Sequence, residues 1–103
     1  MITVTPAAAQ QIRSSARQRQ AEGLPLRIAA TRNPDGSLHY GMGFADDDTQ
    51  QDLSYSSEGI TIVVSPLSLD LLNNTVIDFV ELDNGDKNFI FKNPNDPNYK
   101  PAD

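Results

Sequence analysis

The stretch LHYGMGF, residues 38–44, has the most restrictive pattern in the chain, because apolar side chains alternate with polar or absent ones. A period of two predicts a β-strand with one apolar face and one nearly bare face. Tyr40 and Met42 should therefore belong to the core. Glycines on a strand face allow close approach to the backbone, and we expect a packed neighbour against Gly41 and Gly43.

Further strands are predicted where short apolar runs end at turn residues. Glu58-Gly59 closes one hairpin, and the Asn84-Gly85 pair is typical of a tight turn in another. A loop from Thr31 to Ser37 precedes the alternating strand. The other predicted strands cover Leu26–Ala30, Leu53–Tyr55, Ile60–Val64, Thr75–Leu82 and Lys87–Lys92.

Two helices are predicted from one local signal, a hydroxyl residue followed by proline. Thr5-Pro6 supplies a capping hydroxyl and a proline at the first helical position, so an amphipathic helix is expected over residues 6–22, ended by Gly23. Ser65-Pro66 repeats the signal and predicts a short helix near residues 66–72. The predicted fold class is α+β: strand-rich mixed sheets, one long N-terminal helix laid against them, and one short helix.

The length of 103 residues is that of one ordinary domain. The last ten residues, PNDPNYKPAD, contain three prolines and few apolar side chains. Such a segment has little surface to bury and little reason to pack. We expect a domain over residues 1–95 and a flexible C-terminal tail over residues 96–103.

The charge balance argues against a nucleic-acid partner. Eight Lys and Arg stand against fourteen Asp and Glu, which gives a net charge of −6 that repels phosphate. Arg13, Arg17 and Arg19 fall within the first predicted helix, and we interpret them as a solvated helix face. No apolar run approaches the length of a membrane span or a signal peptide, so we expect no membrane partner and a cytoplasmic location.

The sequence contains no cysteine, which excludes disulfides, thiolate nucleophiles and cysteine-ligated clusters. His39 stands alone on its strand with Asp35 as the nearby carboxylate, so we interpret it as neither a metal ligand nor a general base. The run Asp46-Asp47-Asp48 lacks the spacing of a calcium loop and is expected to be a solvated turn. We expect no catalytic residues, no metal site, no cofactor and no enzymatic activity.

The order of several segments resembles one known family. These segments are ITVTPAAAQQIR, LPLRIAA, LHYGMGF, EGITIVVSPLSLDLL, TVIDFVE and FIFKNPN. Together they are similar to the A-type iron–sulfur carriers, the IscA-like or HesB-like family, from Ile2 to about Asn95. The resemblance implies a HesB-like domain, in agreement with the α+β class.

The chain departs from that family at its ligands. Members carry one cysteine in a loop before the Tyr-Gly strand and two more shortly after the Asn-Pro-Asn motif, and these thiolates hold iron or a cluster. The resemblance places the three lost-ligand positions at Asp35, Lys100 and Ala102. A protonated lysine and an alanine cannot replace thiolates. We expect the loop to be an ordinary tight turn or a protein-contact surface instead. The residues expected to contact a protein partner are Arg27, Arg32, Asn33, Asp35 and His39.

Two functions remain open at this point. The first is a protein-interaction module with an accessory or regulatory role. The chain resembles cysteine-free family members that accompany the reverse dissimilatory sulfite reductase system of sulfur-oxidising bacteria. This resemblance implies a role in cytoplasmic sulfur oxidation. The second is an iron or cluster carrier that uses Asp35 and His39, or ligands from a partner. Without a shared cluster and with a charge of −6, the chain is expected to be mainly monomeric.

Overall fold

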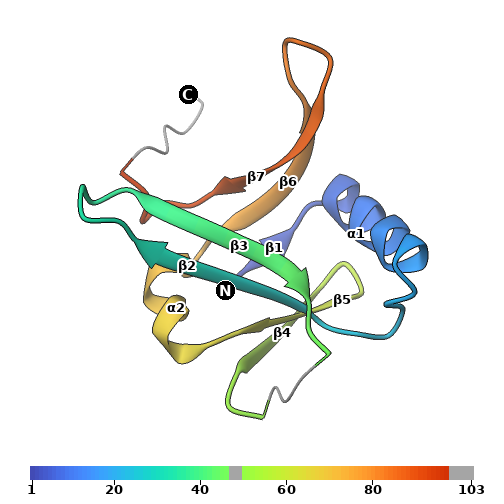
Figure 1. The fold of residues 1–103 in the computed structure, drawn as a ribbon, viewed down its shortest axis with the longest axis horizontal. Helices are drawn as coiled ribbons and strands as arrows, with labels where there is room; N and C mark the ends of the chain where they lie inside the picture. The colour runs from blue at the N-terminus through green and yellow to red at the C-terminus, as the bar shows by residue number, and fades with distance from the viewer. Residues whose placement is uncertain (47–49, 98–103) are drawn as a thin grey trace.

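Two small mixed sheets and two helices make up the described part of the chain (Figure 1). The computed structural model describes residues 1–46 and 50–97. One sheet has the strand order β1-β6-β7 and the other the order β3-β2-β5-β4, and each contains one parallel pair. The predicted α+β class with mixed sheets is confirmed. In chain order the elements are β1 (Thr3–Val4), α1 (Pro6–Gln18), β2 (Leu26–Arg32), β3 (Leu38–Phe44), β4 (Leu53–Ser57), β5 (Ile60–Val64), α2 (Pro66–Leu72), β6 (Val76–Glu81) and β7 (Lys87–Lys92).

The core lies between the inner faces of the two sheets and the buried side of α1. The helix contributes Ala8, Ala9 and Ile12 at a helical spacing. Tyr40 and Met42 of β3 are half-buried against this core, as the alternation in β3 predicts. The fully buried aliphatic side chains that join the layers are Ile2, Ile28, Ile62, Val64, Leu72 and Ile77.

The strand β1 was not predicted from the sequence. It has only two residues and pairs in parallel with β6, so that Thr3 lies opposite Val76. Ile2 is fully buried and Val4 is 5% exposed. A two-residue strand has no periodicity of its own, and only its position beside β6 reveals it.

Helix α1 ends four residues earlier than predicted. Gln20 adopts a left-handed φ of 55°, and the amide of Ala21 donates to the carbonyl of Ala16 at 2.8 Å, as in a Schellman motif. Ala21 is buried, which supplies the apolar contact that accompanies this motif. Gly23, the predicted stop, has a positive φ too, but it lies in the following turn.

The β2–β3 loop is shorter than predicted, because β2 continues through Arg32 in register with Leu38. The loop is therefore residues 33–37. The predicted β6–β7 hairpin is confirmed, with Leu82–Asp86 as its connection. Both predicted helices begin at their hydroxyl caps, since Thr5 and Ser65 each accept an amide hydrogen bond from the first turn.

The cap of α1 is tied to the neighbouring sheet through Asp78. The hydroxyl of Thr5 donates to Asp78 Oδ1 at 2.7 Å, and Lys92 Nζ donates to Asp78 Oδ2 at 3.1 Å. The Thr5 hydrogen bond, followed by the Lys92 interaction, lowers the pKa of Asp78, although burial opposes the shift. One carboxylate therefore joins the start of α1 to β6 and β7.

We expect Asp78→Asn to lower the free energy of unfolding by about 1 kcal/mol at neutral pH, because charged hydrogen bonds are replaced by neutral ones. A folded-state pKa below the unfolded one stabilises the protein above the unfolded value and loses that effect as the pH falls. The difference between wild type and variant should shrink below pH 3.8, the ordinary value for Asp. Urea unfolding at several pH values measures this difference in the free energy of unfolding. The control is Asp83→Asn in the exposed β6–β7 turn. A difference between wild type and Asp78→Asn that grows on acidification would contradict the prediction.

Candidate functional site

The loop at the family's first ligand position is a closed hairpin turn. The amide of Asn33 donates to the carbonyl of Ser37 at 2.8 Å, and the amide of Gly36 donates to the carbonyl of Asn33 at 2.9 Å. Gly36 has a φ of +89°, which favours glycine. Arg32 Nη1 donates to the Gly36 carbonyl at 2.9 Å from the adjoining strand. The predicted tight turn is present, and its own side chains and backbone complete it.

The β6–β7 connection has the same hydrogen bonds. The amide of Leu82 donates to the carbonyl of Asp86, and Gly85 has the same φ of +89°. The side-chain oxygen of Asn84 accepts from the amide two residues later at 3.0 Å, as Asp35 does in the first loop. A loop in a family's ligand position therefore has the conformation of an ordinary hairpin turn in the same chain.

Asp35 uses its carboxylate to stabilise this turn. Its Oδ1 accepts from the Ser37 hydroxyl at 2.6 Å and from the Ser37 amide at 3.0 Å. These two hydrogen bonds lower the pKa of Asp35. The side chain is exposed, so the carboxylate is a local turn acceptor rather than part of an enclosed ligand site.

The segment after β7 is anchored by the buried amide of Asn93, which is 0% exposed. Asn93 Nδ2 donates to the carbonyl of Leu71 in α2 at 2.6 Å and to Tyr40 Oη in β3 at 3.2 Å. Its Oδ1 accepts from the amide of Asn95 at 2.9 Å. One side chain thus joins the short helix, the hairpin strand and the start of the C-terminal segment.

Tyr40 completes this anchor. Its ring stacks on Phe91 with a centroid distance of 4.4 Å, and its hydroxyl donates to Asp96 Oδ2 at 2.6 Å. Burial and then the Asp96 hydrogen bond raise the pKa of Tyr40 to about 12. Asp96 therefore belongs structurally with the domain, one residue beyond the boundary predicted at residue 95. The other two lost-ligand positions, Lys100 and Ala102, lie outside the described residues.

The structure gathers four of the five predicted partner-contact residues at the hairpin end. Arg32, Asn33 and Asp35 lie in or beside the turn, and His39 faces Thr31 two residues into β3. Arg27 does not flank the loop, because it is five residues away along β2, roughly 16 Å. It forms an ion pair with Asp52 at 2.8 Å instead.

Within residues 1–46 and 50–97, the expected packed neighbour does not cover the bare face of β3 at Gly41 and Gly43. Among the described residues, nothing lies within 4 Å of a Cβ built on Gly41 or Gly43. Their register partners on β2, Ala29 and Arg27, are half-buried on the same outer face. β3 is also at the edge of its sheet, so β2 is the one described strand that pairs with it. Sequence reasoning found the glycines but placed a neighbour over them.

The side chains at this end do not fit an iron–sulfur cluster. Within residues 1–46 and 50–97, no group of three or more His, Asp or Glu side chains could hold a metal ion. Asp35 Oδ1 accepts from the Ser37 hydroxyl, and among the described residues neither Asp35 nor His39 belongs to a group of three such side chains. Of the acidic run, Asp46 is exposed, whereas Asp47 and Asp48 lie outside the described residues. In the described part of the chain, no helix is long and apolar enough to cross a membrane.

Comparison with known families gives one match over nearly the whole chain. The model of the family described as iron-sulphur cluster biosynthesis matches residues 1–102. The SufA protein of Bacillus subtilis (strain 168) is 35% identical over 94 residues, which cover 91% of this chain and 78% of the relative. The iron-sulfur cluster insertion protein ErpA of Pseudomonas putida is 32% identical, with 88% and 78% covered.

Solved structures show the same fold. A crystal structure of IscA with the [2Fe-2S] cluster superposes with a TM-score of 0.72 and 28% identity, over 91% of this chain and 83% of that one. Escherichia coli SufA, which is involved in biosynthesis of iron-sulfur clusters, gives a TM-score of 0.72 at 24% identity, with 91% and 86% covered. The cluster in the first structure belongs to that protein.

Asn93 and Asp35 both accept hydrogen bonds from the amide two residues later, but they should differ sharply in their contribution to the free energy of unfolding. We expect Asn93→Ala to lower the free energy of unfolding by about 2 to 3 kcal/mol, because it truncates a fully buried side chain and removes its hydrogen bonds to the Leu71 carbonyl, the Tyr40 hydroxyl and the Asn95 amide. Asp35→Ala should leave the melting temperature nearly unchanged, because its turn is exposed. Thermal and urea unfolding of both variants check this. Equal losses at the two positions would show that the hairpin turn has a structural role comparable to that of the buried anchor.

Proposed function

The chain belongs to the iron-sulphur cluster biosynthesis family, and we propose that it is a non-enzymatic member that recognises a protein partner while holding neither iron nor a cluster itself. The observation that carries this proposal is the absence of cysteine from all 103 residues. Iron–sulfur units prefer thiolate ligands, and hard carboxylate oxygens are poor substitutes. The scaffold is retained, whereas the ligand chemistry is not.

The geometry of the first ligand position supports the loss. Asp35 could supply one oxygen, but it stabilises a turn that has the same hydrogen bonds as the β6–β7 turn. At the other two positions, protonated Lys100 and Ala102 offer no donor to a cation. A cluster or iron held by this chain would need its ligands from another molecule.

The hairpin end offers a surface for a partner. Arg32, Asn33 and His39 are exposed in or beside a turn that its own hydrogen bonds stabilise. The stacked pair Tyr40 and Phe91 supports β3 from the inner side. A rigid, exposed loop on a packed scaffold is the usual arrangement for recognition. The proposed role is accessory or regulatory, in the cytoplasm, and the resemblance to cysteine-free family members points to sulfur oxidation.

The proposal is tested by anaerobic reconstitution with ferrous iron and sulfide, followed by visible absorption and analysis of bound iron and sulfide. We expect the wild-type protein to stay colourless after desalting. The triple variant D35C/K100C/A102C should acquire a charge-transfer spectrum, because thiolates then occupy the three positions on an intact scaffold.

The matched control is D35S/K100S/A102S, which places hydroxyls at the same positions and should stay colourless. A stable spectrum with stoichiometric sulfide in the wild-type protein would contradict the proposal and favour a carrier with ligands other than cysteine. A cluster in the serine variant would have the same meaning.

We also expect the protein to be a monomer at micromolar concentration. Without a cluster to share between protomers, the charge of −6 on each copy opposes association. Light scattering coupled to size exclusion measures the mass, which should be close to 11.3 kDa. A stable dimer that persists in moderate salt would show that an interface independent of a cluster has been kept.

A further inference from the structure

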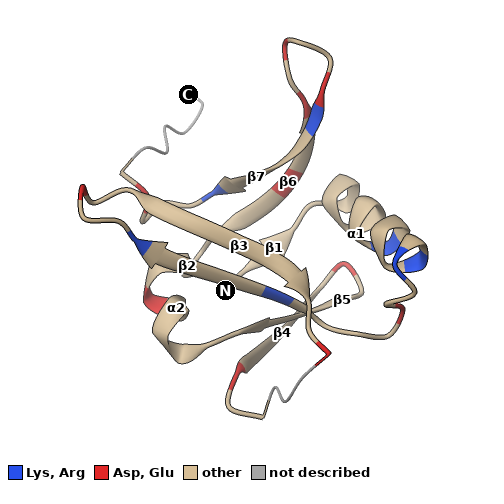
Figure 2. Cartoon of the chain, in the orientation of Figure 1, with Lys and Arg blue, Asp and Glu red and all other residues tan. Residues whose placement is uncertain are grey.

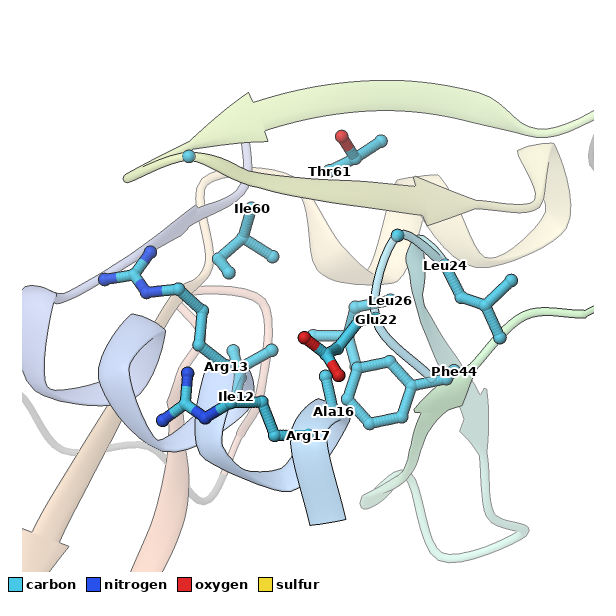
Figure 3. Close-up of a pocket in the computed structure, with 12 residues that line it drawn as sticks. Ile12, Arg13, Ala16, Arg17, Glu22, Leu24, Leu26, Phe44, Ile60 and Thr61 are labelled. Carbon is cyan, nitrogen blue, oxygen red and sulfur yellow. The ribbon is translucent and has the colours of Figure 1, made fainter. Parts of the chain in front are cut away.

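A cavity of about 300 Å³ lies between the last turns of α1, the turn that follows it and β5 (Figure 3). Its apolar lining comes from elements far apart in the sequence, so the fold alone brings it together. Volumes of this size lie at the lower end of those that hold ligands or anchor side chains. The apolar residues that line it include Ile12, Ala16, Leu24, Leu26, Phe44 and Ile60.

A second hollow of about 130 Å³ shares part of its lining with the cavity. It shares Ile12, Leu26 and Phe44 with the cavity and adds Met42 and Phe89. Phe44, Met42 and Phe89 are only partly buried against the core. The cavity and the hollow therefore form one surface, which we call the α1 groove.

Three arginines lie along the groove, and they come from consecutive turns of α1 and its cap. Arg13 and Arg17 line the cavity, and Arg19 lines the hollow. Figure 2 shows these cations gathered at the end of α1, whereas the other Lys and Arg of the described chain are dispersed. The helix contains no acidic residue to pair with them. Three of the eight cations in a chain of net charge −6 thus surround one apolar surface.

All three arginines are exposed, as the solvated-face interpretation predicts, but that interpretation does not account for the apolar groove beside them. Cations near a helix C-terminus are stabilised by its dipole, but Arg13 and Arg17 are four residues apart, where like charges repel. Arg13 Nη1 donates to the carbonyl of Glu58 at 2.9 Å, which ties its exposed side chain to the turn between β4 and β5. Glu22 is the one acidic side chain that lines the cavity, and in Figure 3 it extends toward the cavity between Arg17 and Leu26.

We propose that the α1 groove binds an extended segment of a partner protein in which an apolar side chain stands beside acidic ones. The apolar side chain fills the cavity against Ile12 and Phe44, and the acidic side chains meet Arg13 and Arg17 on the α1 side. Charge complementarity favours such a segment, because a basic one would place like charges beside the arginines and a neutral one would gain no attraction from them. This inference rests on the proposed protein-interaction function and specifies the chemistry of one partner.

The groove is separate from the hairpin end. The loop of residues 33–37 precedes β3, and Phe44, which lines the groove, is the last residue of β3. The seven residues of β3 therefore separate the loop from the groove. In Figure 1 the hairpin turn and α1 lie on opposite sides of the molecule. A partner segment in the groove leaves Asn33 and Asp35 accessible to a second contact.

The test uses fluorescently labelled twelve-residue peptides and the full, untreated protein. The first peptide alternates Leu and Phe with Glu, the second replaces every Glu by Lys, and the third replaces Leu and Phe by Ser. Fluorescence anisotropy should give a saturable Kd for the first peptide and a Kd at least tenfold weaker for the other two. Amide shifts of Gly23 and Gly59 in heteronuclear NMR should locate the first peptide at the cavity.

Separate variants test the charge of the arginines and the shape of the cavity. R13Q/R17Q should weaken binding of the first peptide at least tenfold, and Ala16→Leu, which narrows the cavity without changing charge or helix propensity much, should weaken it at least fivefold. The control Lys87→Gln removes a cation at the start of β7 and should change the Kd less than twofold. Circular dichroism confirms that each variant is folded.

Several results would overturn this inference. The first is a Kd for the Ser peptide equal to that of the first peptide, or no binding of the first peptide at all. The others are a Kd of the first peptide that Ala16→Leu leaves unchanged, or that Lys87→Gln weakens as much as R13Q/R17Q does. Displacement by decanoate alone at similar affinity would assign the cavity to a small carboxylate, and self-association lost in R13Q/R17Q would assign it to a second copy. None of these outcomes alters the reconstitution result, and a cluster bound by the wild type would leave the peptide result standing.

Discussion

The buried amide of Asn93 determines where the C-terminal segment lies relative to the β2–β3 hairpin. A buried amide is costly unless its donors and acceptor are satisfied, and here Leu71, Tyr40 and Asn95 satisfy them. Because those partners come from a helix, an edge strand and the segment itself, the chain can leave β7 in one direction only. Tyr40 then fixes Asp96 beside β3. This arrangement needs no metal, since each of its bonds joins protein groups.

The independence of that anchor explains how ligand chemistry can be lost without losing the fold. The hairpin turn is completed by its own backbone and by Asp35 and Ser37, and the same turn occurs between β6 and β7 where no ligand is expected. The substituted position is exposed, so replacing a thiolate there leaves no cavity and no unpaired buried group. What remains is a shaped surface on a rigid support. The proposed recognition of a protein partner would depend on complementary side chains at this surface rather than on the ligand set.

Much of the fold follows from local signals, and the exceptions have a non-local cause. The hydroxyl caps before Pro6 and Pro66, the alternation in β3 and the β6–β7 turn are local chemistry, and each was predicted. The strand β1 exists only because β6 lies beside it. The early end of α1 depends on a left-handed Gln20 and the burial of Ala21, which the helical pattern of the sequence does not reveal.

The candidate site likewise has features that local sequence predicts and features that only the fold creates. The turn at Asn33–Ser37 was predicted from its residues, since Asn, Pro, Asp and Gly favour a turn wherever they occur together. The role of Asn93 was not, because Leu71 and Tyr40 are 22 and 53 residues away. The α1 groove was missed for the same reason: arginines read along one helix indicate a solvated face, and only the fold places Phe44 and Ile60 beneath them. An acidic chain that collects cations around uncovered apolar surface creates a local potential opposite to its net charge. For the proposed partner, attraction between its acidic side chains and these arginines at contact must outweigh the long-range repulsion from the net charge of −6.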